Sequence, residues 1–224
     1  MFDLGFNKST SNFVRGFAAL VATLGLWAAA QPAAAMTFRT ITGPEACAER
    51  GCILAEGMID QKSSGDLARF VRDNHVQPGA LVVLNSEGGV LLYGLSLGQT
   101  IRRAGLSTTV QAYDAAAHEF RAGGECASAC AFTFLGGVRR DVGQGSRIGV
   151  HQIYANPAAR DGLSVGDAQW LAAQTAEHVD RMGGAVGILI EALRTAPDHI
   201  HWFSERELTS LRVVTAGAMV VASN

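Results

Sequence analysis

Short apolar runs alternate along the chain with stretches whose apolar residues recur at helical spacing. The bounded apolar runs are rich in β-branched residues, which predicts strands over 53–59, 80–84, 106–112 and 146–152. The helical spacing, flanked by turn residues, predicts helices over 63–74, 90–104, 164–182, 185–193 and 203–211. Because strands and helices follow one another in order, we expect an α/β fold with parallel strands and outer helices.

The remaining segments carry weaker patterns. Residues 126–135 are apolar throughout and predict a buried helix, while 138–141 predict a short extended segment. Residues 37–54 hold turn residues without a clear period, and 156–162 predict a loop. The two valines at 213–214 predict a last strand.

The N-terminal segment 1–35 has the pattern of a secretory signal peptide. Lys8 and Arg15 precede an apolar run over 16–30, and three alanines end the segment at Ala35. A membrane anchor is the alternative, but a spanning helix needs about 20 apolar residues, more than this run provides. We therefore expect cleavage after Ala35, no stable membrane insertion afterwards, and a single periplasmic or secreted domain over 36–224.

Composition narrows the class of protein. Charged residues make up 17% of the 224 residues and hydrophobic ones 48%, with 26 glycines, which excludes a disordered chain or a coiled coil. The net charge is −2, so the surface gives no electrostatic basis for binding nucleic acid.

Four cysteines form two local pairs, Cys47 with Cys52 and Cys126 with Cys130. An even number of cysteines in an exported chain indicates disulfides, and four cysteines allow three connectivities. Cys47–Cys52 is the easier bridge, whereas Cys126 and Cys130 enclose a serine and are either bridged or reduced. Zinc binding is the alternative, but neither spacing is the usual C-x2-C, so no metal site is predicted.

Three short segments carry candidate chemistry. They are N-S-E-G-G at 85–89, C-A-S-A-C-A-F at 126–132 and R-I-G-V-H-Q at 147–152. Their order and spacing resemble those of the Clp protease proteolytic subunit and its crotonase-fold relatives, although Glu87 replaces the proline usual in the first segment. The likeness extends over 53–215. It implies a ClpP/crotonase-like spiral of repeated strand–helix units with parallel sheets and outer helices.

The resemblance implies that Ser128 is a nucleophile and His151 its base. A serine hydroxyl is a poor nucleophile unless an adjacent base takes its proton. Ser128 precedes a predicted helix, whose first N–H groups are unpaired and whose dipole is positive at that end. The backbone of Gly88 and Gly89, together with the Ala129 N–H, could then form an oxyanion hole.

The third member of a catalytic triad is less clearly placed. The resemblance puts an aspartate at position 200, which is isoleucine here, so Asp198 is the nearest candidate, two residues early. His201 is an alternative group to orient His151. A related exported-side enzyme, signal peptide peptidase A, uses a lysine base, but no lysine follows Ser128, and Lys62 would have to fold back.

These features lead to a main hypothesis and two alternatives. The main hypothesis is an exported serine hydrolase, a peptidase that acts on a peptide or a small ester or amide without a cofactor. The first alternative is a non-catalytic periplasmic binding or assembly module of the same fold. The second is acyl-CoA chemistry, which export disfavours. The helix over 164–182 is a candidate interface for a homo-oligomer, and His75, His118 and His178 are expected at the surface.

Overall fold

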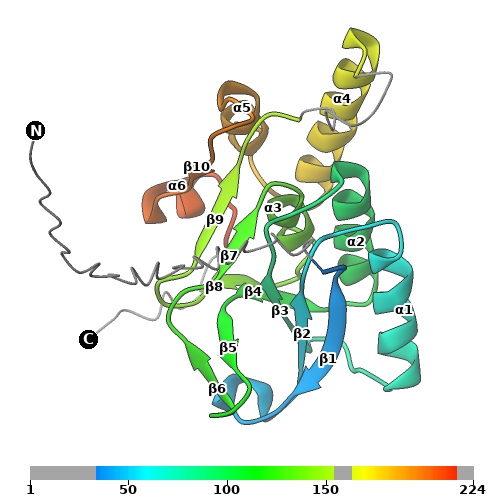
Figure 1. Cartoon of the computed structure of the whole chain (residues 1–224), viewed down its shortest axis with the longest axis vertical. Coiled ribbons are helices and arrows are strands. Elements are labelled where there is room, and N and C mark those ends of the chain that lie inside the picture. Colours follow the sequence, from blue (N-terminus) through cyan, green and yellow to red (C-terminus); the bar gives the residue numbers. More distant parts are fainter. Residues whose placement is uncertain (1–33, 154–162, 216–224) are drawn as a thin grey trace, which may run out of the picture. The chain divides into compact units, whose positions relative to one another are not determined.

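The computed structural model describes residues 34–153 and 163–215, all within one compact unit, Ala33–Asn224. Its larger sheet has the strand order β1-β2-β3-β4-β8 (Figure 1). The five strands are β1 (Thr37–Ile41), β2 (Cys52–Glu56), β3 (Leu81–Asn85), β4 (Ser107–Val110) and β8 (Arg140–Val142). The last four are parallel, and β1 pairs antiparallel with β2.

A second, smaller sheet carries the middle and last motif segments. Its order is β10-β9-β7, in which β7 (Glu125–Ala127) and β9 (Arg147–Val150) are parallel. The short strand β10 (His201–Trp202) pairs antiparallel with β9. Two further strands, β5 (Ala112–Asp114) and β6 (Glu119–Arg121), form an antiparallel hairpin.

Helices connect the strands. They are η1 (Glu45–Cys47, a 3-10 turn), α1 (Ser63–Asp73), α2 (Leu91–Arg103), α3 (Ala129–Phe134), α4 (Val165–Arg181), α5 (Gly187–Arg194) and α6 (Glu205–Ser210). Capping boxes begin α4 and α6, at Ser164 with Asp167 and at Ser204 with Glu207. Helix α2 lies between α1 and α3 and contacts both (Figure 1).

The central strands are buried on both faces, which explains their continuous apolar runs. In β3, Val82 and Leu84 enter the main core, which also includes residues of α2 and α3. The intervening Val83 enters a second cluster on the opposite side, together with Leu54. Tyr113 of the β5–β6 hairpin packs against that second cluster, so the hairpin covers the sheet face that the helices leave open.

Two arginines, the buried Arg140 and the half-buried Arg102, donate hydrogen bonds to backbone carbonyls around the end of α3. Arg102 Nε donates a hydrogen bond to Gly136 O (2.8 Å), and Arg140 Nε donates one to Val213 O (2.7 Å). Arg140 also donates to Met182 O at the end of α4 (3.0 Å). Burial lowers the pKa of Arg140 to about 10, with a smaller contribution from the nearby Arg102 charge. The carbonyl ends of α3 and α4 are negative, so they favour these cations there.

Most predicted elements are confirmed, including the parallel strands with helices between them. The single helix over 126–135 is wrong, because Cys126 and Ala127 pair with β9 and the helix begins only at Ala129. The strand at 213–214 is also wrong, since these residues lie in a bend. The sequence did not predict β1 or the β5–β6 hairpin, and the loop at 156–162 lies outside the described residues.

Candidate active site

Ser128 stands in a sharp turn between β7 and α3. Its backbone has φ 56° and ψ −122°, a region that non-glycine residues seldom adopt. Holding a residue there costs about 1–3 kcal/mol, and such conformations cluster at functional sites. The Ser128 N–H donates to Gly149 O (2.9 Å), and its carbonyl accepts from the Ala131 N–H (3.0 Å). The turn is thus held by β9 on one side and by the helix on the other.

The glycine turn after β3 lies directly against Ser128. A Cβ on Gly88, where φ is 107°, would lie 2.6 Å from Ala127 O and 2.9 Å from Ser128 Cβ. A Cβ on Gly89, where φ is 146°, would meet the backbone of Ile59. Only glycine permits both the backbone conformation and these approaches. The glycines therefore bring the backbone of the 85–89 turn to the candidate nucleophile.

Three backbone N–H groups were expected in an oxyanion hole. Among residues 34–153 and 163–215, the N–H groups of Gly89 and Ala129 have no hydrogen-bond acceptor, whereas the Gly88 N–H donates to Ser86 Oγ (3.1 Å). Ala129 is the first residue of α3, where an N–H has no partner within the helix. In the described ranges, the Ala129 N–H next to Ser128 and the Gly89 N–H in the neighbouring glycine turn are thus without an acceptor, while the oxyanion role itself stays a prediction.

His151 follows β9 as Ser128 follows β7. The two strands lie side by side (Figure 1) and are parallel, with Ala127 opposite Gly149. Both residues therefore stand at the same end of neighbouring strands. The imidazole is half-buried, and its Nδ1 lies 2.8 Å from Gln152 O. Because a carbonyl only accepts hydrogen bonds, this contact places the proton on Nδ1 and makes Nε2 the basic nitrogen.

The carbonyl that faces His151 is itself held in place. The Gln152 N–H donates to Thr195 O (2.9 Å), and its side-chain amide donates to Leu193 O (2.7 Å). Both acceptors lie at the end of α5. The histidine orientation therefore depends on how α5 docks beside β9.

The candidate third members of the triad have other partners. The Asp198 carboxylate lies 2.8 Å from His199 Nδ1, and both side chains are 75% exposed. This hydrogen bond lowers the pKa of Asp198. His201 Nε2 instead lies 2.9 Å from Glu207 of α6. These contacts disfavour Asp198 as the group that orients His151, a role that only an experiment can test.

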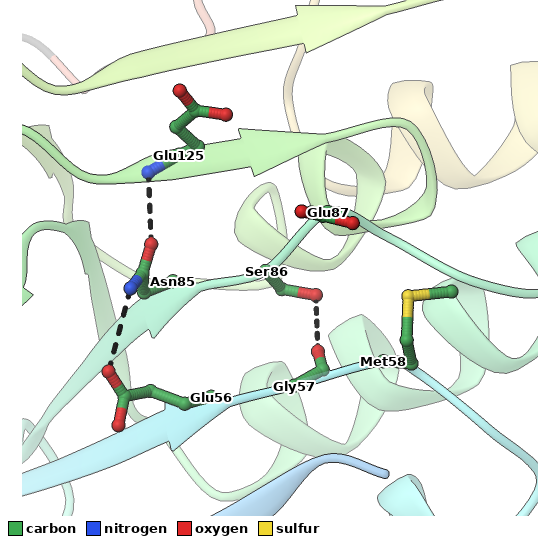
Figure 2. A pocket seen from close by; sticks show the side chains of 7 residues that line it. All are labelled: Glu56, Gly57, Met58, Asn85, Ser86, Glu87 and Glu125. Carbon is green, nitrogen blue, oxygen red and sulfur yellow. Dashed lines mark hydrogen bonds between the residues drawn. The ribbon is translucent and has the colours of Figure 1, made fainter. Parts of the chain in front are cut away.

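A pocket of about 380 Å³ opens beside the glycine turn (Figure 2). It lies where β2 and β3 end and β7 begins, and its walls are Glu56, Gly57, Met58, Asn85, Ser86, Glu87 and Glu125. Asn85 accepts from the Glu125 N–H (3.1 Å), and Ser86 Oγ donates to Gly57 O (2.6 Å). These two side chains, which belong to the N-S-E-G-G motif, tie the three strands together beneath the turn. Sequence reasoning did not assign them a role.

The cysteines form two disulfides, Cys47–Cys52 and Cys126–Cys130, each with a Cα–Cα distance of 5.0 Å. Within the described ranges, no group of three or more His, Cys, Asp or Glu side chains could hold a metal ion. No helix in those ranges has both the length and the hydropathy that crossing a membrane requires. The Lys62 side chain is exposed at the start of α1, three residues after Ile59.

His178 corrects one expectation from the sequence. It lies in α4 and is 0% exposed, and its Nε2 donates to Phe132 O of α3 (2.9 Å). His75 and His118 are exposed, as predicted. A single histidine in an amphipathic helix gives no local signal of burial, because its position depends on the neighbouring helix.

Comparisons with known proteins bear on the fold. No family model and no curated protein matches the chain. A serine-to-alanine variant of the 1510-N membrane-bound stomatin-specific protease superposes with a TM-score of 0.51 and 13% identity, covering 70% of this chain and 73% of that one. A lysine-to-alanine variant of that protease, in complex with a substrate peptide, superposes with a TM-score of 0.50 and 15% identity, covering 69% of this chain and 66% of that one.

At such low identity the likeness establishes the fold alone. The chain has an α/β fold of the ClpP/crotonase-like type, as the motif resemblance implied. Because one fold can carry many activities, the function has to be argued from the residues of the site.

Proposed function

We propose that this protein is an exported serine hydrolase that cleaves peptides through an acyl-enzyme on Ser128. The observation that carries the proposal is the conformation of Ser128, which is held at positive φ between β7 and α3 with the Gly88 backbone against it. His151 at the end of the adjacent parallel strand supplies the base. Backbone strain at a residue with a weakly nucleophilic hydroxyl favours a catalytic role over a packing role.

The proposed reaction uses only groups of this chain. His151 Nε2 takes the Ser128 hydroxyl proton while Oγ attacks the substrate carbonyl carbon. The Gly89 and Ala129 N–H groups stabilise the oxyanion that develops. Collapse of the tetrahedral intermediate expels the leaving amine, which receives the proton from His151. Water then hydrolyses the acyl-enzyme by the same route and restores Ser128.

Two features support the substrate class and the compartment. Proteins of similar fold include a protease in complex with a substrate peptide, and the pocket of about 380 Å³ beside Gly88 offers space for a side chain. The two disulfides suit an oxidising compartment, in keeping with the N-terminal segment 1–35 as a removable signal peptide. A small ester or amide would react by the same steps.

A reactive-serine probe tests the proposal. A fluorophosphonate should phosphonylate wild-type protein, with the adduct on Ser128 by peptide mass spectrometry, and Ser128→Ala should not react. His151→Ala should lower the second-order labelling rate by about 100-fold or more, because proton transfer typically contributes 10²–10⁴-fold. Lys62→Ala is the matched control for the alternative base and should label at the wild-type rate.

The same assay measures the role of Asp198. Since this carboxylate is exposed and bonded to His199, Asp198→Asn should change the labelling rate by less than about threefold. A loss of about 100-fold would instead assign Asp198 as the third triad member. Wild-type protein that is folded by circular dichroism but unreactive would contradict the enzymatic proposal and favour the binding or assembly module.

A further inference from the structure

We propose that the Cys126–Cys130 disulfide is a positioning clamp that holds Ser128 in its reactive conformation. The inference deepens the proposed function and rests on it for its catalytic meaning. Cys126 lies in β7 and Cys130 is the second residue of α3, so the bridge spans the strand–helix junction. Ser128 is the middle residue of the three that it encloses.

The clamp lies inside the main core. Cys126 and Cys130 are both 0% exposed, and both belong to the apolar cluster around α2 and α3. A covalent link between two buried positions fixes both ends of the enclosed segment. The backbone of residues 127–129 is then confined to conformations that close this ring, and the observed one holds Ser128 at φ 56°.

Without the bridge, hydrogen bonds alone would hold the turn. The Ala127 N–H donates to Ser86 O (3.0 Å), and the Ser128 N–H donates to Gly149 O (2.9 Å). Serine favours negative φ, so the reduced segment would relax toward ordinary backbone conformations. That relaxation would move the hydroxyl away from Gly88 and from the end of β9. Small displacements of this kind are costly to a reaction, because rate depends steeply on alignment.

Opening the clamp is a two-electron reduction. A dithiol such as dithiothreitol attacks one sulfur, the S–S bond breaks, and Cys126 and Cys130 each gain one electron and one proton as thiols. The reagent loses two electrons and two protons as it closes to its cyclic disulfide. Reoxidation by glutathione disulfide reverses the change through a mixed disulfide.

The second disulfide provides an internal control. Cys52 is the first residue of β2, whereas Glu56 at the far end of that strand lines the pocket. Cys47 and Cys52 belong to the second apolar cluster, on the opposite side of the sheet from the α2–α3 core. Removing this pair should therefore eliminate one disulfide and leave the Ser128 turn intact.

The experiment uses the full chain with Cys47→Ala and Cys52→Ala as the background, so that only one disulfide can change. Fluorophosphonate labelling rates are measured on oxidised, reduced and reoxidised protein, and on protein that also carries Cys126→Ala and Cys130→Ala. Intact mass confirms each redox state. Hydrogen exchange over residues 126–132 is followed in parallel by mass spectrometry.

The clamp predicts that the background labels at the wild-type rate, that reduction slows labelling by about 100-fold, and that reoxidation restores it. The pH midpoint of labelling should stay unchanged, because the clamp holds Ser128 and not His151. Exchange over 126–132 should quicken by about tenfold or more on reduction.

Equal labelling rates in oxidised and reduced protein would overturn the clamp. If no form labels, the proposed function fails, and hydrogen exchange then decides the clamp on its own. Faster exchange in the reduced protein supports the clamp, and equal exchange contradicts it. If the double alanine variant does not fold, the reduction and reoxidation arms give the same test with an unchanged turn sequence.

Discussion

At the residue scale, Ser128 differs from the other non-glycine residues that have positive φ within 34–153 and 163–215. These are His75, His118 and Arg212, which are exposed residues in turns or next to them. Ser128 is half-buried, and its ψ of −122° lies outside the left-handed helical region that asparagine or histidine can enter at modest cost. The Gly88 backbone, the Gly149 carbonyl and the Cys126–Cys130 bridge surround this conformation. The strain is therefore stored at the residue that is the nucleophile of the proposed reaction.

The first prediction concerns Gly88. Gly88→Ala forces a Cβ against the Ala127 carbonyl at a positive φ, so it should destabilise the fold by about 2 kcal/mol or more and abolish Ser128 labelling. Gly65→Ala is the matched control, because its Cβ meets nothing within 4 Å inside α1, and it should stabilise by about 0.5–1 kcal/mol. Urea denaturation measures both. A Gly88→Ala protein with wild-type stability would show that the turn is not packed on Ser128 as described.

At the scale of elements, α4 is joined to α3 through a buried histidine. His178 Nε2 donates to Phe132 O, and burial lowers the pKa of the imidazole, with smaller contributions from Arg181 and Arg102. Its Nδ1 is buried and has no hydrogen-bond partner in the described part of the chain. Protonation of Nδ1 would place a positive charge in the core, near the guanidinium groups of Arg181 and Arg102. The packing of α4 on α3 therefore favours the neutral form of the His178 imidazole.

This arrangement predicts that stability depends on pH. The folded pKa of His178 is below its unfolded value of about 6.5, so the unfolded chain binds more protons between the two values. The free energy of unfolding should fall as pH drops from about 7 through that window, by at most about 1.4 kcal/mol per pH unit from this group. His178→Leu should remove that slope in urea denaturation. The exposed-histidine control His75→Asn should keep it, and an unchanged slope in His178→Leu would contradict the assignment.

At the scale of the whole molecule, the described unit brings together a sheet, a hairpin that covers one of its faces, and helices that carry the core on the other. Helix α4 presents Val165 and Trp170 to solvent, 76% and 53% exposed. The homo-oligomer through 164–182 and the export of the chain both stay predictions.

Export has a direct test. When the full-length gene is expressed in a bacterium with a signal peptidase, the periplasmic product should begin at Met36 and be two hydrogens lighter for each of its two disulfides. Met36 is 5% exposed, and its N–H donates to Met58 O (2.8 Å), so cleavage after Ala35 keeps this core residue. Intact mass spectrometry of the periplasmic fraction gives the answer. A membrane-bound product that retains residues 1–35 would identify the segment as an anchor.

The sequence by itself determined the elements whose information is local. The apolar run of β3 and the helical spacing of α2 and α4 each lie within one short segment. Their local pattern was therefore sufficient to predict these elements. The order and spacing of the motifs at 85–89, 126–132 and 147–152 resemble those of one family, and that resemblance implied that the three segments meet. The two cysteine pairs are also close in sequence, so the sequence indicated both as candidate disulfides.

Only the tertiary structure decided what depends on distant partners. Cys126 and Ala127 read as helix locally, but hydrogen bonding to β9 makes them strand and so creates the Ser128 turn. The burial of His178 depends on its contact with α3, so the sequence of its own helix, α4, could not predict it. Asp198 has His199 as its hydrogen-bond partner, a contact that motif alignment could not supply. Long-range pairing supplies free energy that local propensity lacks, and at this site it overrides that propensity.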